Sequence, residues 1–180
     1  MEYLLLCEGS NEKAVIDLLI DDNKLFISRK NLLNREVFVC RQICKTPSVV
    51  NALRIYDSEV FIFRIGDKLN DEFVIPKEFQ NKINKVNIKK LCTKPEIEML
   101  LIINQKKVKE YEKCKSNLSP KVFAKINIKM NKRKYDCRTD FWSIYYKDRV
   151  NELVDDIKYQ KKYKKNTKIK DEEYLADLLK

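Results

Sequence analysis

Two apolar, strand-like runs in this chain each end beside a glycine and a carboxylate. Glu8 follows residues 3–7 and Asp67 follows residues 60–66, and the two neighbouring glycines are the only ones among the 180 residues. Glycine allows a sharp backbone turn and the close approach of a bulky group such as a phosphate. We therefore expect Glu8 and Asp67 to face a shared site, with Glu8 as metal ligand or general acid–base and Asp67 as metal ligand.

Further carboxylates follow these two runs and the predicted strand at 85–93, and they strengthen the expectation of a metal site. They are Glu12, Asp71, Glu96 and Glu98. Two such charges 4 Å apart repel by about 4 kcal/mol at an effective dielectric constant near 20, so a cluster needs a cation or a proton to offset it. Carboxylate oxygens favour Mg²⁺ or Mn²⁺, and one or two ions are expected here.

Each of these additional acids also has an ordinary structural explanation. Glu12, Glu96 and Glu98 fit the first turns of predicted helices, where the helix dipole favours negative charge. Asp71 fits a turn. Both explanations stay open at the level of sequence.

The absence of histidine narrows the possible chemistry. With no histidine in the chain, Ser-His-Asp and Cys-His nucleophiles and His-ligated zinc are excluded. Three of the six cysteines lie in apolar runs, and no paired CxxC motifs suggest a zinc knuckle. No secretory signal and no apolar run of about 20 residues is evident, so we expect a cytoplasmic protein with reduced thiols and no membrane contact.

The elements that must position the acids alternate between strands and helices. Strands are predicted at 3–7, 37–40, 60–65 and 85–93. Helices are predicted at 11–22 after a Ser10 or Asn11 cap, from Pro47 after a Thr46 cap, and after a Thr93 cap. Alternation of this kind predicts an α/β fold with a mainly parallel four-stranded sheet flanked by helices. Since ligands bind at the carboxyl ends of parallel strands, the acids should share one rim.

The chain divides by character near residue 105. We expect an α/β domain at 1–105 and a basic helical C-terminal extension at 106–180 packed on it. The aromatic segment at 140–146 is expected to lie in the core rather than to stack on bases.

The motifs of the first part resemble those of Toprim domains. "LLLCEGSNEKAVIDLL" looks like the first Toprim motif, and "FIFRIGDKLND" stands where the Asp-x-Asp element is expected. "KPEIEMLLI" is similar to the Glu-Ile-Glu segment of small nucleases related to the overcoming-lysogenization-defect family. In place of Asp-x-Asp, Lys68 and Leu69 follow Asp67, so Asp71 must supply the second acid or a ligand is missing.

The resemblance implies a Toprim-like, metal-dependent nuclease that cleaves phosphodiesters in DNA or RNA. It makes Glu8 the first-motif glutamate, with Glu12 as an added acid, Asp67 the first acid of the second motif, and Glu98, with Glu96, the late acid. It also implies a phage-defence or mobile-element setting, with a separate ATPase or other defence protein as a possible partner. The alternative is a non-catalytic Toprim-like subunit that binds nucleic acid or protein through a degenerate metal site.

A net charge of +11 favours a nucleic-acid partner, although AT-rich coding would also produce a lysine-rich surface. The segment 157–170 holds seven lysines and no acid, with tyrosines interleaved. A solvated lysine-rich face is the alternative there. The residues expected to contact nucleic acid are Arg41, Lys94, Lys132, Arg133, Lys134, Lys158, Lys161, Lys162, Lys164 and Lys165.

Overall fold

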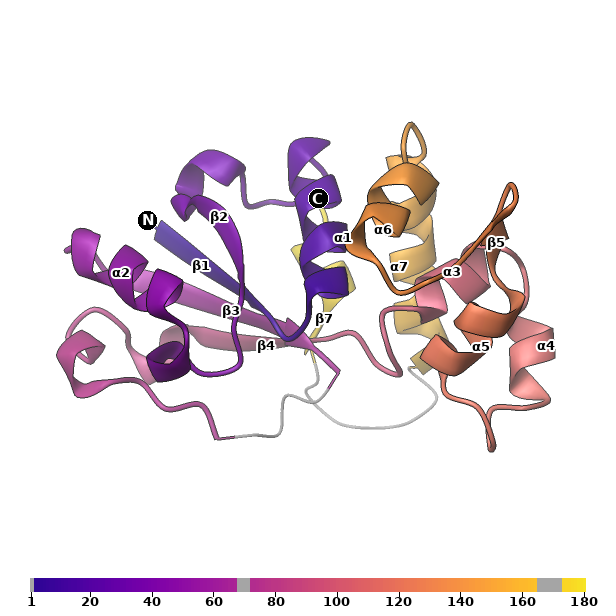
Figure 1. Cartoon of the computed structure of the whole chain (residues 1–180). Helices are drawn as coiled ribbons and strands as arrows, with labels where there is room; N and C mark the ends of the chain where they lie inside the picture. The colour runs from indigo at the N-terminus through magenta and orange to yellow at the C-terminus, as the bar shows by residue number, and fades with distance from the viewer. Residues whose placement is uncertain (1, 68–71, 165–172) are drawn as a thin grey trace.

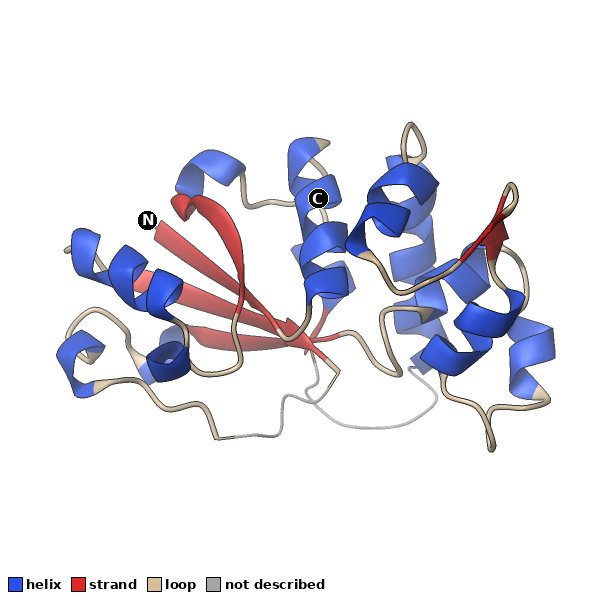
Figure 2. Cartoon of the chain, viewed as in Figure 1, coloured by secondary structure: helices blue, strands red, loops and turns tan. Residues whose placement is uncertain are grey.

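A computed structural model of the chain describes residues 2–67, 72–164 and 173–180. Its sheet elements are β1 (Glu2–Cys7), β2 (Leu32–Val39), β3 (Val60–Gly66), β4 (Ile88–Cys92) and β7 (Glu173–Tyr174), and a separate hairpin consists of β5 (Lys129–Met130) and β6 (Arg133–Lys134). The helices are α1 (Ser10–Asp21), α2 (Pro47–Ile55), α3 (Met99–Asn104), α4 (Val108–Glu112), α5 (Pro120–Asn127), α6 (Thr139–Tyr145) and α7 (Val150–Lys164). The fold is α/β, with a parallel sheet flanked by helices (Figure 2).

The sheet has the order β2-β1-β3-β4-β7, and all its pairs are parallel. The prediction of four strands was wrong, because within the described residues a fifth short strand, β7, joins at the β4 edge. The chain leaves β1 toward β2 on one side and returns to β3 on the other. The direction of winding therefore reverses between β1 and β3, where a ligand crevice is expected in an open α/β sheet.

Alternation along the strands gives the sheet a core on each face. Leu4 and Leu6 pack with α2 on one face, whereas Leu5 and Cys7 pack with α1 on the other. The core on the α1 side continues into the C-terminal helices, where Trp142 is fully buried. Figure 1 shows these helices beside α1 and beyond the carboxyl ends of the strands. The aromatic segment at 140–146 supplies core, as predicted.

Several element boundaries differ from the prediction. Helix α1 takes Gly9, not Ser10 or Asn11, as its N-cap residue. The Lys94–Pro95 peptide is cis, and α3 begins at Met99 rather than directly after Thr93. Helix α2 does begin at Pro47 after Thr46, as expected.

The C-terminal part is less uniformly helical than predicted. The basic segment 127–138 contains the β5–β6 hairpin, and the closing residues form β7 and a short 3₁₀ turn at Leu175–Leu178. The predicted boundary at 105 falls directly after α3, whose buried residues belong to the same core as α1. No helix within the described ranges is both long enough and apolar enough to span a membrane.

Candidate functional site

A cavity of about 300 Å³ lies at the carboxyl ends of β1 and β3. Its lining includes most of the acids that the sequence singled out, namely Glu8, Glu12, Asp67, Glu96 and Glu98. The remaining one, Asp71, lies outside the described residues. Figure 1 shows the carboxyl ends of β1 and β3 at the same edge of the sheet, the edge that faces the C-terminal helices. We call this cavity the acidic pocket.

Strand register brings the two central acids to the same level. Cys7 pairs with Ile65 across the parallel β1–β3 ladder, so Glu8 and Gly66 are the next positions on neighbouring strands. The backbone N–H of Glu8 donates to the carbonyl of Ile65 at 2.8 Å. Asp67 follows directly after Gly66. The acidic pocket therefore occupies the position where the winding direction of the sheet reverses, which general rules for open α/β sheets assign to ligands.

Glu8 is buried and paired with an exposed arginine. Its carboxylate Oε1 lies 3.2 Å from a guanidinium nitrogen of Arg41, and the side chains are 9% and 68% exposed respectively. Arg41 follows the end of β2, whose last residues pair with β1. A cation from the neighbouring strand end thus neutralises the central glutamate.

Glu12 folds back over Gly9 at the start of α1. A Cβ placed on Gly9 would lie 2.7 Å from Oε2 of Glu12, which is closer than a side chain tolerates. Gly9 has a φ of −138°, and neither glycine has a positive φ. Gly9 thus leaves space for the Glu12 carboxylate, and its backbone does not use the left-handed region that favours glycine.

The electrostatic environment of Glu12 favours its protonated form. Burial raises the pKa of its carboxyl from 4.5 to about 7, and the charges of Glu98, Asp67 and Glu8 act in the same direction, against a backbone hydrogen bond that lowers it. A carboxyl with this pKa holds a proton for part of the time near neutral pH. A cation or a proton close to Glu12 would therefore offset the charge that burial and its neighbouring carboxylates disfavour.

Glu98 is the most deeply buried of the acids, with 3% of the residue exposed. The Tyr135 hydroxyl donates to its Oε1 at 2.8 Å, and the Asn11 amide donates to the same oxygen at 3.3 Å. The Asn11 amide also donates to the Tyr135 oxygen at 3.0 Å. Burial, followed by the charge of Glu98, raises the pKa of Tyr135 far above its usual value, so the hydroxyl stays protonated and donates. Three segments distant in sequence meet in this network.

The Asn11 side chain leaves one buried acceptor without a donor. Its Nδ2 makes both bonds of the network, which fixes the orientation of the amide, and its Oδ1 has no hydrogen-bond partner among the residues described. The residue is 9% exposed and lines the acidic pocket. Buried acceptors are rarely left unpaired, and a bound cation or water is a usual explanation.

Glu96 has a role that its spacing did not predict. Its Oε2 accepts a hydrogen bond of 2.7 Å from the backbone N–H of Lys121, in the first turn of α5. It thereby caps a helix that is distant in sequence and does not occupy the first turn of its own helix. Lys121 lines the acidic pocket together with Cys137.

The donor set of the acidic pocket suits a hard divalent cation, because it consists of carboxylates and one amide oxygen. Within residues 2–67, 72–164 and 173–180, however, no group of three or more Cys, Asp or Glu side chains is arranged to hold a metal ion. The carboxylates of Glu8, Glu96 and Glu98 instead bind Arg41, the amide of Lys121, and Tyr135 with Asn11. A metal ion would have to compete with these donors.

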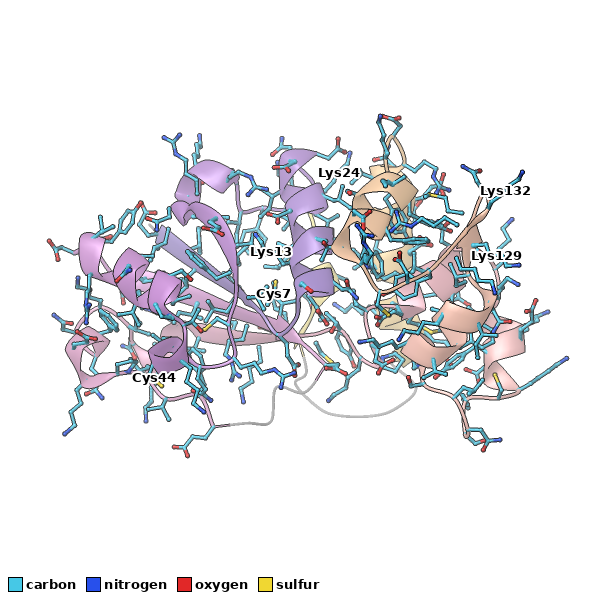
Figure 3. The ribbon with its side chains drawn as sticks, viewed as in Figure 1. Cys7, Lys13, Lys24, Cys44, Lys129 and Lys132 are labelled. Carbon is cyan, nitrogen blue, oxygen red and sulfur yellow. The ribbon has the colours of Figure 1, made fainter. Side chains whose placement is uncertain are left out.

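The predicted nucleic-acid contacts are dispersed. Arg41 lines the acidic pocket, whereas Lys132 and Lys134 are exposed on the β5–β6 hairpin. In Figure 3 Lys132 stands at the far side of the C-terminal helices from Cys7, the last residue of β1. Lys158 and Lys162 are exposed on α7, and Lys94 is half-buried after β4. The side chain of Lys164 and the whole of Lys165 lie outside the described part of the chain.

Two of these cations are already engaged by carboxylates. Arg133 donates to Asp136 at 2.9 Å and to Asp140 at 3.0 and 3.1 Å, and its guanidinium lies over the ring of Phe141. Lys161 forms an ion pair with Asp177. These contacts indicate structural roles for both residues, which their charge alone did not reveal.

Sequence reasoning missed four residues of this site: Asn11, Lys121 and Cys137 line the acidic pocket, and Tyr135 donates to Glu98 behind it. Asn11 follows the Glu-Gly motif directly, so its place after a strand end was a usable signal. No local signal marks the other three, because they lie in the C-terminal part and reach the pocket only through the tertiary fold. Comparisons with protein-family models, with curated proteins and with solved structures each found no match for this chain.

Proposed function

We propose that the protein is a Mg²⁺- or Mn²⁺-dependent phosphodiesterase that cleaves DNA or RNA at the acidic pocket. One observation carries the proposal: five carboxylates and Asn11, whose buried amide oxygen has no donor among the described residues, line one cavity where the winding of a parallel sheet reverses. The raised pKa of Glu12 supports it, since burial and the charges of Glu98, Asp67 and Glu8 disfavour an uncompensated carboxylate at this position.

The residues take distinct roles in this proposal. Glu8, Asp67 and Glu98, with the Oδ1 of Asn11, would hold one or two ions. A bound Mg²⁺ or Mn²⁺ supplies Lewis-acid polarisation and lowers the pKa of water. Arg41 and Lys121, which line the acidic pocket, would bind the phosphate. Glu12, with a pKa near neutrality, is suited to accept or donate a proton.

The resemblance to Toprim domains supports the same assignment. The order of the motifs is retained, with Glu8 after the first strand, Asp67 after a later one, and Glu96 and Glu98 after β4. A Toprim-like nuclease in a phage-defence or mobile-element system, with an ATPase as a separate chain, remains part of this proposal.

Substitution of Glu8 tests the function directly. Glu8→Gln should lower Mn²⁺-dependent cleavage of mixed DNA and RNA substrates by about a hundredfold or more, which is the range that a charge-stabilising or proton-transferring group contributes. Glu36→Gln, at an exposed position of β2, is the matched control and should cleave as the wild type does. Equal cleavage by the wild type and the Glu8 variant would overturn the assignment.

A second candidate function, a non-catalytic binding subunit, is favoured by one specific observation. Glu8, Glu96 and Glu98 each already contact a protein donor. In that case the acidic pocket only stabilises the fold, and exposed lysines such as Lys132, Lys134, Lys158 and Lys162 bind the nucleic acid or protein partner. Thermal melting with millimolar Mn²⁺ separates the two, because a ligand that binds only the folded state must raise the melting temperature.

A further inference from the structure

The Glu8–Arg41 ion pair competes with the roles proposed for its two side chains, metal binding and phosphate binding. Glu8 is needed by the metal, and Arg41 is suited to the phosphate, yet the two side chains bind one another at 3.2 Å. Each is therefore withheld from its proposed ligand.

Separation of the ion pair would cost Glu8 more free energy than it would cost Arg41. Glu8 is almost fully buried beside other carboxylates, so it needs a cation nearby. Arg41 is mostly exposed, and exposed ion pairs are weak. Its guanidinium also matches the geometry of a phosphate, to which it can donate two parallel bonds.

The backbone at Arg41 is anchored, so only the side chain has to move. The N–H of Cys40 donates to the carbonyl of Cys7 at 2.9 Å, which holds the end of β2 against the end of β1. Rotation of the Arg41 side chain away from Glu8 therefore needs no rearrangement of the sheet.

We propose that Arg41 is the resident counter-ion of Glu8, and that a divalent metal displaces it toward the substrate phosphate. Metal and nucleic acid then bind cooperatively, since each favours the arrangement that the other requires. This inference rests on the proposed function and adds a coupling between its two ligands.

Mn²⁺ binding in the absence of nucleic acid tests the displacement, with free Mn²⁺ followed by electron paramagnetic resonance. Arg41→Ala should tighten Mn²⁺ binding about two- to fivefold, which corresponds to the loss of a weak competing ion pair. Lys121→Ala removes the same charge from the pocket lining and keeps the backbone amide that binds Glu96. It should tighten Mn²⁺ binding less than Arg41→Ala does.

The second arm measures the coupling, with phosphorothioate oligonucleotides of DNA and of RNA as probes. Mn²⁺ should strengthen oligonucleotide binding by the wild type more than by Arg41→Ala. If wild type and Arg41→Ala bind Mn²⁺ equally, the displacement is refuted and the proposed function stands. If neither binds Mn²⁺, the proposed function itself fails, and the inference fails with it.

Discussion

Gly9 and Glu12 are in such close contact that a single added methyl group at Gly9 would overlap the Glu12 carboxylate. The Cβ would lie 2.7 Å from Oε2. The first glycine of the chain therefore serves the position of an acid one helical turn away. This relationship links the sequence motif to the electrostatics of the acidic pocket.

Gly9→Ala should displace the Glu12 carboxylate without unfolding the protein. The overlapping atom is at the end of a flexible side chain, and the backbone at Gly9 is extended, so the fold accommodates alanine. We expect Mn²⁺ affinity to fall by about tenfold, as when a supporting group at a metal site is disturbed. The same substitution in a Glu12→Ala background should have no further effect, and an equal loss there would refute the link.

Glu12 should make the protein less stable as the pH rises through neutrality. An acid whose pKa is raised by folding stays protonated in the folded chain while it ionises in the unfolded chain. The contribution of Glu12 to the free energy of unfolding is fully present below pH 4.5. It is lost as the pH rises from 4.5 to about 7. At about 1.4 kcal/mol per pKa unit, the loss is roughly 3 kcal/mol.

Denaturant unfolding of wild type and Glu12→Gln, in EDTA, measures this contribution. The difference in stability between the two should shift in favour of Glu12→Gln from pH 4.5 to 8. Asp156, whose pKa burial raises to about 6, acts in the same direction in both proteins and cancels. Parallel pH profiles would show that Glu12 titrates normally.

Tyr135→Phe should destabilise the metal-free protein, because it removes the hydroxyl that donates to buried Glu98. The expected loss is about 1–3 kcal/mol, the cost of an unmade hydrogen bond to a buried group. Added Mn²⁺ should recover part of it if Glu98 is a ligand. Tyr111→Phe is the control, since the Tyr111 hydroxyl makes no hydrogen bond within the described residues. Equal melting temperatures for the two variants would contradict the role of Tyr135.

The exposed lysines of α7 and the engaged Arg133 should behave differently when removed. The double substitution Lys158→Ala and Lys162→Ala should reduce the slope of the logarithm of the nucleic-acid binding constant against the logarithm of the salt concentration by about 1–2. It should leave the melting temperature unchanged. Arg133→Ala should lower the melting temperature instead, because it leaves Asp136 and Asp140 without their partner. Titrations at several salt concentrations, with melts of each variant, separate the two effects. A normal melt for Arg133→Ala together with weakened binding would reverse this assignment.

The strand-end acids could be predicted from the sequence because their placement depends on local order. Glu8 and Asp67 each follow an apolar run, and parallel strands align such ends at one edge. Alternation of short strands and helices was sufficient for the α/β class. The resemblance to Toprim domains stays a prediction.

The remaining features depend on contacts between distant segments. Tyr135 reaches Glu98 across 37 positions, and β7 pairs with β4 more than 80 residues earlier, so neither leaves a local pattern. Glu96 was expected as a metal ligand or as a first-turn acid of the helix after Thr93, and its contact with the backbone of Lys121 in α5 could not be predicted from either. The sequence suggested an unpaired Arg133, because Asp136 in the loop after β6 and Asp140 in α6 meet it only once this part of the chain has folded.

Crystals of the protein soaked in Mn²⁺, with anomalous scattering recorded, test the central claim most directly. The account predicts an anomalous peak in the acidic pocket, in contact with the carboxylates of Glu8 and Asp67, and Arg41 turned away from Glu8. An acidic pocket without anomalous density at saturating Mn²⁺, with Arg41 still bound to Glu8, would contradict it.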